Sequence, residues 1–356
     1  MPTFRLTMLP ASDGDCLIVT WGDAGKCSHA VIDGGRAAAY PHLHRHLVEM
    51  ADAGETLELY VLTHIDADHI AGALLYLKAK ARPIEPKQVW FNGYRQVRPG
   101  DRRSMRQGDE YSEALEKLSW PLNTGFERGV VSIETAPAEL EVAGLKITLL
   151  SPDATRLKVL GERWDEWRHE QQESEQREAR EDTRGGGKRE RPPVPDPLVI
   201  EDLVADSETD HGLPNGSSIA FVAEWGAARM LLAGDAHPDM IAASLTPMAE
   251  LEGGRYHVDL LKASHHGSAR NTTREVIELL DCTRLAISTN GNLHDHPDPQ
   301  SIARFLHFGS AGHKHLHFNY ATDRTLPWGV ETVKLRYDYE THFPPATEGE
   351  LAIDLL

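Results

Sequence analysis

Apolar residues recur along this chain in short runs separated by turn-forming residues, a pattern typical of strands with interspersed helices. In the first half, the runs predict strands at residues 4–9, 16–20, 30–32, 59–63, 88–91, 130–133, 139–142 and 145–150. Helical spacing instead places Leu43, Leu47 and Met50 on one face of a helix over 40–52. Further helices are expected over 70–79 and 109–118.

The same alternation returns in the second half of the chain, from Ser217 onward. Apolar runs predict strands at 219–225, 229–233, 258–263 and 285–288, and helices at 238–245 and 273–280. Two successive strand-rich halves with interspersed helices favour two sheets packed face to face, with the helices outside.

A segment of different composition separates the two halves. Residues 156–191 are dominated by Glu, Arg and Gln, and glycines at 185–187 and prolines at 192–193 end the run. Such a segment buries little apolar surface, so we expect a charged, flexible insertion at about 156–212. The alternative to a plain surface insertion is that residues 156–191 dock a partner protein.

The bulk composition restricts the classes of partner. A formal net charge of −18 disfavours broad attraction to nucleic acid, although metal ions held by carboxylates keep nuclease chemistry open. No run approaches the ~18 apolar residues of a membrane helix, and the first residues lack a signal-peptide pattern. Three cysteines are too few for a disulfide framework. We therefore expect a cytoplasmic protein with no membrane segment.

The strand expected at 59–63 ends in four metal-ligand side chains within six positions: His64, Asp66, Asp68 and His69. Such a group behind a buried strand is costly unless something binds there. In an extended turn, His64 and Asp66 can face one ion while Asp68 and His69 face a second. Imidazole and carboxylate together suit zinc, manganese or iron and leave a coordination position for water. The motif therefore predicts the metal centre of a hydrolase.

Other strand ends carry residues of the same type. Asp235 follows one expected strand, His265 and His266 follow another, and His296 follows a third. Strand ends can bring such distant positions together on a rigid base. Either His265 or His266 can reach a metal in a sharp turn, while the other contacts substrate or protonates the leaving group. His296 is a candidate ligand or general acid.

Two further groups receive structural interpretations. Asp33 ends a strand, and we expect it to brace the loop that carries His64 rather than to bind metal. His313, His315 and His317 alternate, so they share one face of a strand, which we expect to be a solvated edge rather than a metal site.

Taken in order, these motifs resemble the metallo-β-lactamase superfamily. The matching pieces are residues 14–15, 32–35, 63–72, 215–218, 231–235, 262–268 and 296–297. Within the superfamily, the chain looks most like the soluble hydrolase domain of the ComEC-type competence proteins. The resemblance implies an α+β fold, an αββα sandwich of two mixed β-sheets flanked by helices, with residues 1–356 forming one domain.

The resemblance also implies a binuclear centre with two divalent ions, Zn²⁺ as the first expectation and Mn²⁺ as the alternative. The implied metal ligands are His64, Asp66, Asp68, His69, Asp235, His265 and His266, with Asp235 between the two ions. The implied catalytic residues are Asp68, His266 and His296. Two features depart from the broader superfamily. Asp66 replaces a histidine, and the mid-chain histidine ligand has no clear counterpart; the nearest features are His211 and residues 215–218.

These observations predict a metal-dependent hydrolase that uses metal-activated water, with a phosphodiester of a nucleic acid or nucleotide as the preferred substrate. A basic rim built from residues such as Arg270 and Arg274 would favour phosphate. Apolar and aromatic walls would favour a lactone, thioester or β-lactam, because the fold does not fix the substrate. The third alternative is a non-catalytic module that binds metal and a partner.

Overall fold

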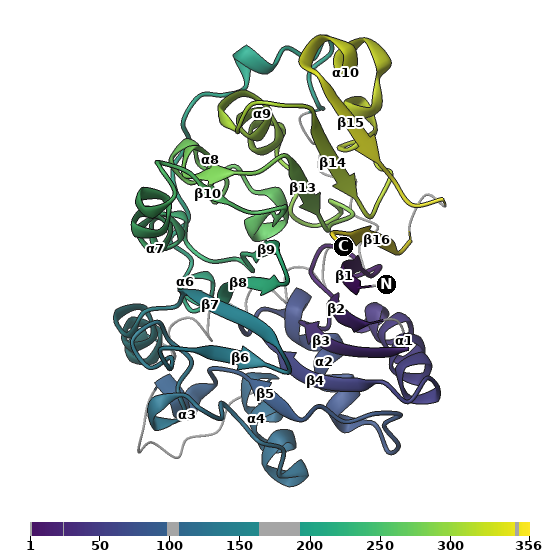
Figure 1. Ribbon diagram of the computed structural model, residues 1–356, viewed down its shortest axis with the longest axis vertical. Helices are drawn as coiled ribbons and strands as arrows, with labels where there is room; N and C mark the ends of the chain where they lie inside the picture. The colour runs from purple at the N-terminus through teal and green to yellow at the C-terminus, as the bar shows by residue number, and fades with distance from the viewer. Residues whose placement is uncertain (1, 24, 98–106, 164–192, 346–348) are drawn as a thin grey trace, which may run out of the picture.

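Two β-sheets form the centre of the computed structural model, which describes residues 2–23, 25–97, 107–163, 193–345 and 349–356 (Figure 1). The first sheet has the order β16-β1-β2-β3-β4-β5. Its strands are β1 (Pro2–Met8), β2 (Leu17–Asp23), β3 (Lys26–Ile32), β4 (Thr56–Val61), β5 (Gln88–Trp90) and β16 (Leu351–Asp354). The pairs β1·β2, β2·β3 and β1·β16 are antiparallel, whereas β3·β4 and β4·β5 are parallel, so the sheet is mixed.

The second sheet has the order β15-β14-β13-β11-β9-β8-β7-β6. Its strands are β6 (Leu140–Val142), β7 (Leu145–Ser151), β8 (Ala220–Trp225), β9 (Ala228–Leu232), β11 (Leu260–Lys262), β13 (Arg284–Ile287), β14 (Lys314–Phe318) and β15 (Tyr339–His342). A small parallel pair joins β10 (Tyr256–His257) to β12 (Leu280–Asp281). This sheet is parallel from β9 to β15 and antiparallel from β6 to β9.

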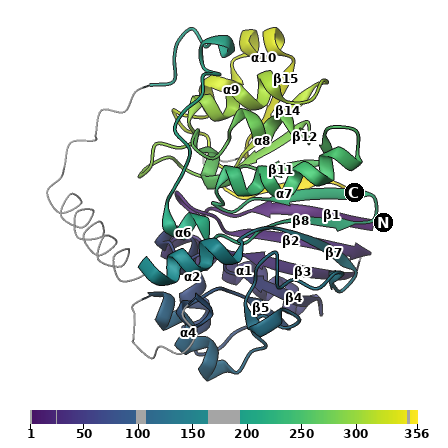
Figure 2. The same ribbon diagram turned by 90° about the vertical axis from the view of Figure 1, so that its left-hand side faces the viewer.

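Helices cover the outer faces of both sheets, as Figure 2 shows. The first sheet packs on α1 (Tyr40–Asp52), α2 (Ala67–Lys78) and α4 (Gln107–Leu118). The second packs on α7 (Pro238–Leu251), α8 (Arg274–Glu278) and α9 (Pro299–Phe308). Three further helices are short: α3 (Tyr94–Val97), α6 (Leu213–Gly216) and α10 (Glu331–Tyr337). Residues 154–163 are also helical. The predicted αββα layering is confirmed.

Strand alternation explains why the sheets stack. Along β2, Leu17, Val19 and Trp21 point into the core between the sheets, while Ile18 points to the helices. Phe221 and Met230 enter the same central core from the second sheet. Because side chains alternate across a strand, each sheet buries one face against its partner sheet and the other against helices.

The strand expected at 130–133 does not form. Val131 is fully buried, which accounts for the apolar run, but its backbone pairs with a side chain rather than with a neighbouring strand. Asn92 Oδ1 accepts from the Val131 amide at 3.0 Å, and Asn92 Nδ2 donates to the Val131 carbonyl at 2.7 Å. An asparagine thus satisfies both backbone groups of this residue, and no ladder is needed.

The expected insertion at 156–212 lies largely in residues 164–192, outside the described residues, and so does the partner-docking surface predicted there. Its described flanks are packed. Leu157 and Leu160 are buried with the helices of the first sheet, whereas Leu198 and Ile200 are buried in the core under the second sheet. The flank before the insertion therefore packs in the helix layer of the first sheet, and the flank after it packs in the helix layer of the second sheet. Within the described part of the chain, no helix is long and apolar enough to cross a membrane.

Glycine permits the closest approach beside the metal motif. A Cβ on Gly72, in α2, would lie 2.0 Å from the Gly34 carbonyl oxygen, and a Cβ on Gly34 would lie 2.0 Å from the Ala73 nitrogen. The loop after β3 therefore touches α2 backbone to backbone, and Gly72 N–H donates to Gly35 O at 2.9 Å. This contact sets the position of the helix whose first turn carries Asp68 and His69.

We predict that Gly72→Ala destabilises the protein by at least ~1–3 kcal/mol, because backbone atoms must move to admit the methyl group. The sign of the stability change distinguishes the two cases, because a Gly→Ala change in an unconstrained helix stabilises the protein by roughly 0.5–1 kcal/mol. Urea unfolding measures the difference. Gly329→Ala is the matched control, because its Cβ would meet nothing closer than 3.6 Å. A Gly72→Ala protein as stable as the parent would contradict the close contact.

Candidate metal centre

The metal motif occupies the turn from β4 into α2. β4 is buried from Leu57 to Val61, so the turn starts from a rigid base. Asp66 is the N-cap of α2, with extended backbone at φ −69° and ψ 148°, and Asp68 and His69 lie in the first helical turn. An acidic side chain is favoured there because the N-terminal end of a helix carries partial positive charge.

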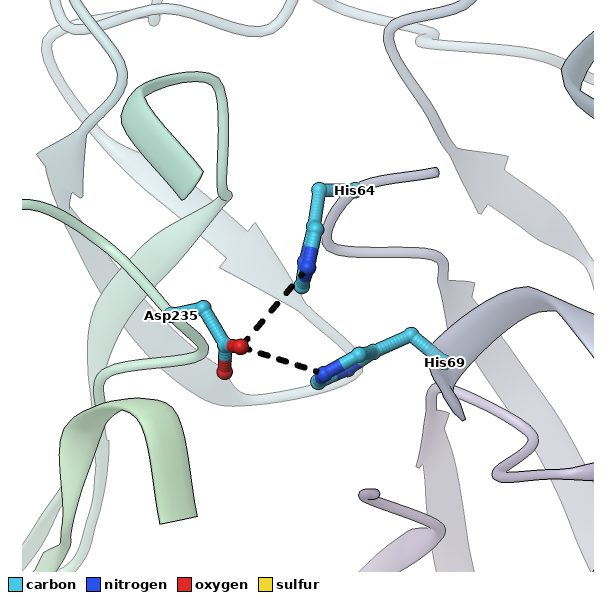
Figure 3. A group of neighbouring side chains, drawn as sticks. All are labelled: His64, His69 and Asp235. Carbon is cyan, nitrogen blue, oxygen red and sulfur yellow. Dashed lines mark ion pairs between the residues drawn. The ribbon is translucent and has the colours of Figure 1, made fainter. Parts of the chain in front are cut away.

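The second sheet contributes the opposing side chains from two strand ends. Asp235 follows β9 through Gly234, and the turn Ser264–Gly267 follows β11. His265 and His266 both have left-handed backbone, with φ of 48° and 54°, an uncommon conformation for residues other than glycine. Figure 3 shows Asp235 reaching toward His64 and His69 from the other sheet.

Four imidazoles converge on one carboxylate. Asp235 Oδ2 lies 3.4 Å from His69 Nε2, 3.6 Å from His266 Nε2, and 3.8 Å from both His64 Nε2 and His265 Nε2. Asp68 Oδ2 lies 3.5 Å from His266 Nε2 and 3.8 Å from His69 Nε2. Within the described residues, ligand atoms within 4.8 Å of one another form four overlapping groups: His64, His69 and Asp235; Asp68, His69 and His266; Asp15, Asp235 and His266; and Asp15, Asp33 and His69.

The far sides of the rings determine what the inner nitrogens can do. His69 Nδ1 faces Asp33 Oδ2 at 2.7 Å, and His266 Nδ1 faces the Ser288 carbonyl at 3.1 Å. Both partners are acceptors only, so each Nδ1 carries the proton and each Nε2 presents a lone pair in the neutral ring. These two Nε2 atoms lie 3.2 Å apart. Two facing lone pairs repel each other unless a proton or a metal ion lies between or beside them.

The Nε2 atom of His64 is also a buried lone pair without a partner. Thr63 Oγ1 donates to Asp33 Oδ2 at 2.8 Å, so it accepts from His64 Nδ1 at 3.0 Å. His64 Nε2 is then a buried acceptor, and it has no hydrogen-bond partner. A buried, unsatisfied acceptor aimed at carboxylates is explained by a bound metal ion. The residues therefore fit a divalent metal of the imidazole-binding class.

Electrostatics at the cluster favour positive charge. Burial lowers the pKa of His266, but the Asp235 and Asp15 carboxylates outweigh it and raise that pKa to about 10. The pKa of His69 is raised for the same reason, against burial, chiefly by Asp235 and Asp33. The pKa of Asp235 falls well below its usual range because the surrounding imidazoles outweigh its burial. A metal ion supplies the positive charge that this field stabilises.

The structure brings five of the predicted residues into this cluster: His64, Asp68, His69, Asp235 and His266. Asp66 stands at its border, with Oδ2 3.6 Å from His64 Nε2, a side chain 24% exposed and Oδ1 buried without a partner. His265 contacts the cluster at a single carboxylate, that of Asp235, and its side chain is partly exposed. His296 lies outside the ligand groups; its ring centre is 5.2 Å from that of His265.

Asp33 braces the loop that carries His64, as predicted, and it also contacts the ring of His69, which was not predicted. Its Oδ1 accepts from the Thr63 amide at 2.7 Å, and its Oδ2 accepts from Thr63 Oγ1 and His69 Nδ1. Asp33 has φ of 60° and is completely buried.

A buried ion pair behind His266 was missed in the sequence. Lys262 Nζ donates to Asp15 Oδ2 at 2.7 Å, and Asp15 Oδ1 lies 3.5 Å from His266 Nδ1. Burial opposes ionisation of Asp15, yet Lys262 and His266 bring its pKa well below the usual range. The available signal was a lysine at the end of an otherwise apolar strand, since a buried charge needs a partner.

Asp210 was missed because it lies at the end of the charged insertion. Its Oδ2 accepts from Asn215 Nδ2 at 2.7 Å and Asn271 Nδ2 at 3.0 Å, and lies 3.3 Å from His265 Nδ1. Its amide also donates to the Arg270 carbonyl. The returning end of the insertion therefore holds the ring of His265. His211, the nearest feature to the missing mid-chain ligand, instead lies beside His237, with ring centres 6.3 Å apart.

The sequence profile of the metallo-β-lactamase superfamily matches residues 13–291. The chain belongs to this superfamily. Its sandwich is the metallo-β-lactamase fold, and most members of the superfamily are metal-dependent hydrolases. The residues that converge on Asp235 lie within the matched region.

Two solved structures similar to this chain each cover nearly all of it at low identity. The metallo-β-lactamase fold protein YhfI from Bacillus subtilis is 12% identical, with 99% of each chain covered and a TM-score of 0.41. Zn²⁺-bound PqqB from Methylobacterium extorquens is 11% identical, with 98% of this chain and 100% of that chain covered and a TM-score of 0.40. Comparison with curated proteins gave no match.

We predict that Asp33→Asn lowers Zn²⁺ affinity by about 10–100-fold, because the amide cannot accept all three hydrogen bonds that orient His64 and His69. Competition with a chromogenic chelator measures the affinity. Asp52→Asn, the same change at the exposed end of α1, is the control and should leave the affinity unchanged. Equal affinity in parent and Asp33→Asn protein would show that Asp33 does not orient the ligands.

Proposed function

We propose that this protein is a hydrolase of phosphodiesters that uses two divalent metal ions and an activated water. The observation that carries the proposal is the set of three buried imidazole Nε2 atoms, on His64, His69 and His266, directed at the carboxylates of Asp235 and Asp68. Such a set has no structural use in a neutral core.

The residues divide between two ions. His64 and Asp66 would hold the first, and Asp68, His69 and His266 the second. Asp235 would bridge them, because its Oδ2 lies near the inner nitrogens of both groups. When bound, two such ions lower the pKa of a shared water and polarise a phosphoryl oxygen. Zn²⁺ suits the imidazoles, and the carboxylate of Asp66 widens the range to Mn²⁺.

The chain's own residues orient the substrate and supply protons. His265 and His296 stand next to the cluster, and His294 lies beyond them with its ring 6.4 Å from that of His296. Imidazole N–H groups at this rim can donate hydrogen bonds to phosphate oxygens. The departing oxygen needs a proton, and His296 is the candidate donor, because its ring stands beside that of His265 and its Nδ1 faces Asp298 Oδ2 at 3.6 Å. Asp210 fixes His265 in this row.

The choice of a phosphodiester is supported by this row of imidazoles and by the resemblance to the competence-type hydrolases. It does not draw on the basic rim expected from Arg270 and Arg274. Arg274 donates to Glu278 at 2.9 Å and stacks on Phe308, and Arg270 lies 3.6 Å from Glu208. In this proposal, the imidazoles of His265, His296 and His294 contact the phosphate instead of the two arginines. A nucleotide or a short single strand suits a protein with net charge −18 better than a long duplex.

We predict that untagged protein, supplied with Zn²⁺ or Mn²⁺, hydrolyses bis(p-nitrophenyl) phosphate. Asp68→Asn should lower kcat/KM by at least ~100-fold, because the change removes a charged ligand from the second ion. His296→Gln should lower kcat with this substrate less than with an alkyl diester, whose leaving group depends more on protonation. Release of p-nitrophenol and chromatography of the alkyl product measure the rates.

Asp52→Asn is again the matched control and should retain full activity. Phosphodiester turnover that survives Asp68→Asn unchanged would contradict the proposed centre. Metal binding with hydrolysis of a lactone or thioester, but of no phosphodiester, would overturn the substrate class while leaving the centre intact. Metal binding without any hydrolysis would indicate a binding module.

A further inference from the structure

A cavity of 480 Å³ lies beside α1, outside the cluster around Asp235. Its wall comes from the loop between β1 and β2, from α1 and the turn before it, from the loop after β14, and from the segment between β15 and β16. Its volume lies within the ~300–1,000 Å³ typical of small-molecule sites. We call this cavity the α1 pocket.

The α1 pocket lies at the same edge of the sandwich as the metal centre. The strands β9, β11, β13 and β14 are parallel neighbours, so their carboxyl ends form a row along this edge. The residues that follow these strands are, in order, Asp235, His266, His296 and Tyr320. Tyr320 lines the pocket. Because neighbouring strands are ~4.8 Å apart, the end of β14 lies about 10 Å from the end of β11.

One short loop connects the pocket with the metal centre. Ser12 lines the pocket. Asp13 Oδ2 lies 3.8 Å from Nε2 of His294, the outermost imidazole of the row beside the cluster. Gly14 packs on the backbone of Asp68, since a Cβ at this glycine would overlap the Asp68 carbonyl oxygen. Three consecutive residues therefore lead from the pocket wall, past the imidazole row, to a metal ligand.

This loop is held in place by hydrogen bonds to the second sheet. The Ser12 amide donates to the Tyr320 hydroxyl at 2.9 Å, and the Ser12 carbonyl accepts from the Asn290 amide at 2.8 Å. Ser288 Oγ donates to the Gly14 carbonyl at 3.0 Å. The distance between the pocket and the metal centre is therefore fixed by the ends of β13 and β14.

The charged groups around the pocket are paired with one another. Arg45 Nη2 donates to Glu350 Oε2 at 2.6 Å, and both residues line the pocket. Next to Ser12, Arg36 donates to both carboxylate oxygens of Asp13 at 2.8–3.3 Å. Phosphate binding depends on Lys and Arg side chains whose charge is available to the ligand. The pocket therefore suits a neutral group better than a second phosphate.

The wall combines apolar surface with a few polar groups. Pro10, Ala38 and Pro344 contribute apolar surface, while Ser12 and Glu350 offer hydrogen-bonding oxygens. This mixture is typical of sites that bind a ring system and fix its orientation by a few hydrogen bonds. A nucleoside has the matching chemistry, because its base is a flat ring with a hydrogen-bonding edge and its sugar carries oxygen atoms.

We propose that the α1 pocket binds the base and sugar of one nucleoside of the substrate while the metal centre holds the phosphodiester that is cleaved. This inference rests on the proposed hydrolase function and narrows its substrate to one that carries a nucleoside beyond the cleaved bond. The ~10 Å between the strand ends corresponds to two or three nucleotides at a spacing of ~3.4 Å. Recognition of the base needs no basic surface, which suits a chain with net charge −18.

The test fills the pocket from an exposed position of its wall. Ala38→Trp places a large side chain at the pocket, and Ala37→Trp is the matched control, because Ala37 is the exposed neighbour that does not line the pocket. The ligand is hexathymidylate with phosphorothioate linkages, which slow hydrolysis, and calorimetry on Zn²⁺-loaded protein measures its affinity. We expect Ala38→Trp to weaken binding by at least ~10-fold and Ala37→Trp to leave it unchanged.

A second ligand identifies the base as the group that is recognised. The same strand without bases should bind the parent more weakly by a similar factor, and Ala38→Trp should cause no further loss, because no base enters the pocket. A folded Ala38→Leu protein should show a smaller loss with hexathymidylate in the same direction. All three variants should keep the parent's turnover of bis(p-nitrophenyl) phosphate, since this small diester does not extend to the pocket.

Equal affinity of hexathymidylate for the parent and for folded Ala38→Trp and Ala38→Leu proteins would overturn the assignment of the pocket. An equal loss in Ala37→Trp, or an equal loss with the strand that lacks bases, would do the same. Bis(p-nitrophenyl) phosphate turnover reports only the metal centre. A parent protein without this turnover would contradict the proposed function, while binding that depends on Ala38 would still support the pocket.

Discussion

The carboxylate of Asp33 is the constraint on which the rest of the site depends. It is completely buried and accepts from the backbone and hydroxyl of Thr63 and from His69 Nδ1. Through Thr63 it also sets the proton of His64 on Nδ1. One side chain therefore selects the tautomer of both histidines and leaves their Nε2 atoms as buried acceptors. Those acceptors are tolerable only if a cation occupies the space that they face.

The sandwich explains how two sequence halves complete one centre. The turn after β4 brings His64, Asp68 and His69 from the first sheet, and the ends of β9 and β11 bring Asp235 and His266 from the second. The central core aligns the sheets, and the Lys262–Asp15 pair adds a link across them near His266. Replacing one partner of such a buried pair costs about 3–5 kcal/mol, because the other charge is then left buried without a partner.

The fold and the first ligands were predictable because they depend on local pattern. Alternation of apolar residues located most strands. The first ligands were recognisable because His64, Asp66, Asp68 and His69 lie within six positions directly after a strand. The strand predicted around Val131 failed because the side chain of Asn92, far along the chain, takes over the backbone hydrogen bonds. Asp15 and Asp210 went unrecognised because their partners, Lys262 and His265, are distant in sequence. The solvated edge expected at His315 and His317 is instead an inner strand, because β15 pairs with the outer side of β14.

The most direct measurement is anomalous X-ray diffraction at the zinc edge from crystals of untagged protein grown with Zn²⁺. This account predicts two peaks about 3.5–4 Å apart beside Asp235, one near His64 and one between His69 and His266. Well-ordered crystals with no peak beside Asp235, or with rings of His64 and His69 turned to other partners, would contradict it.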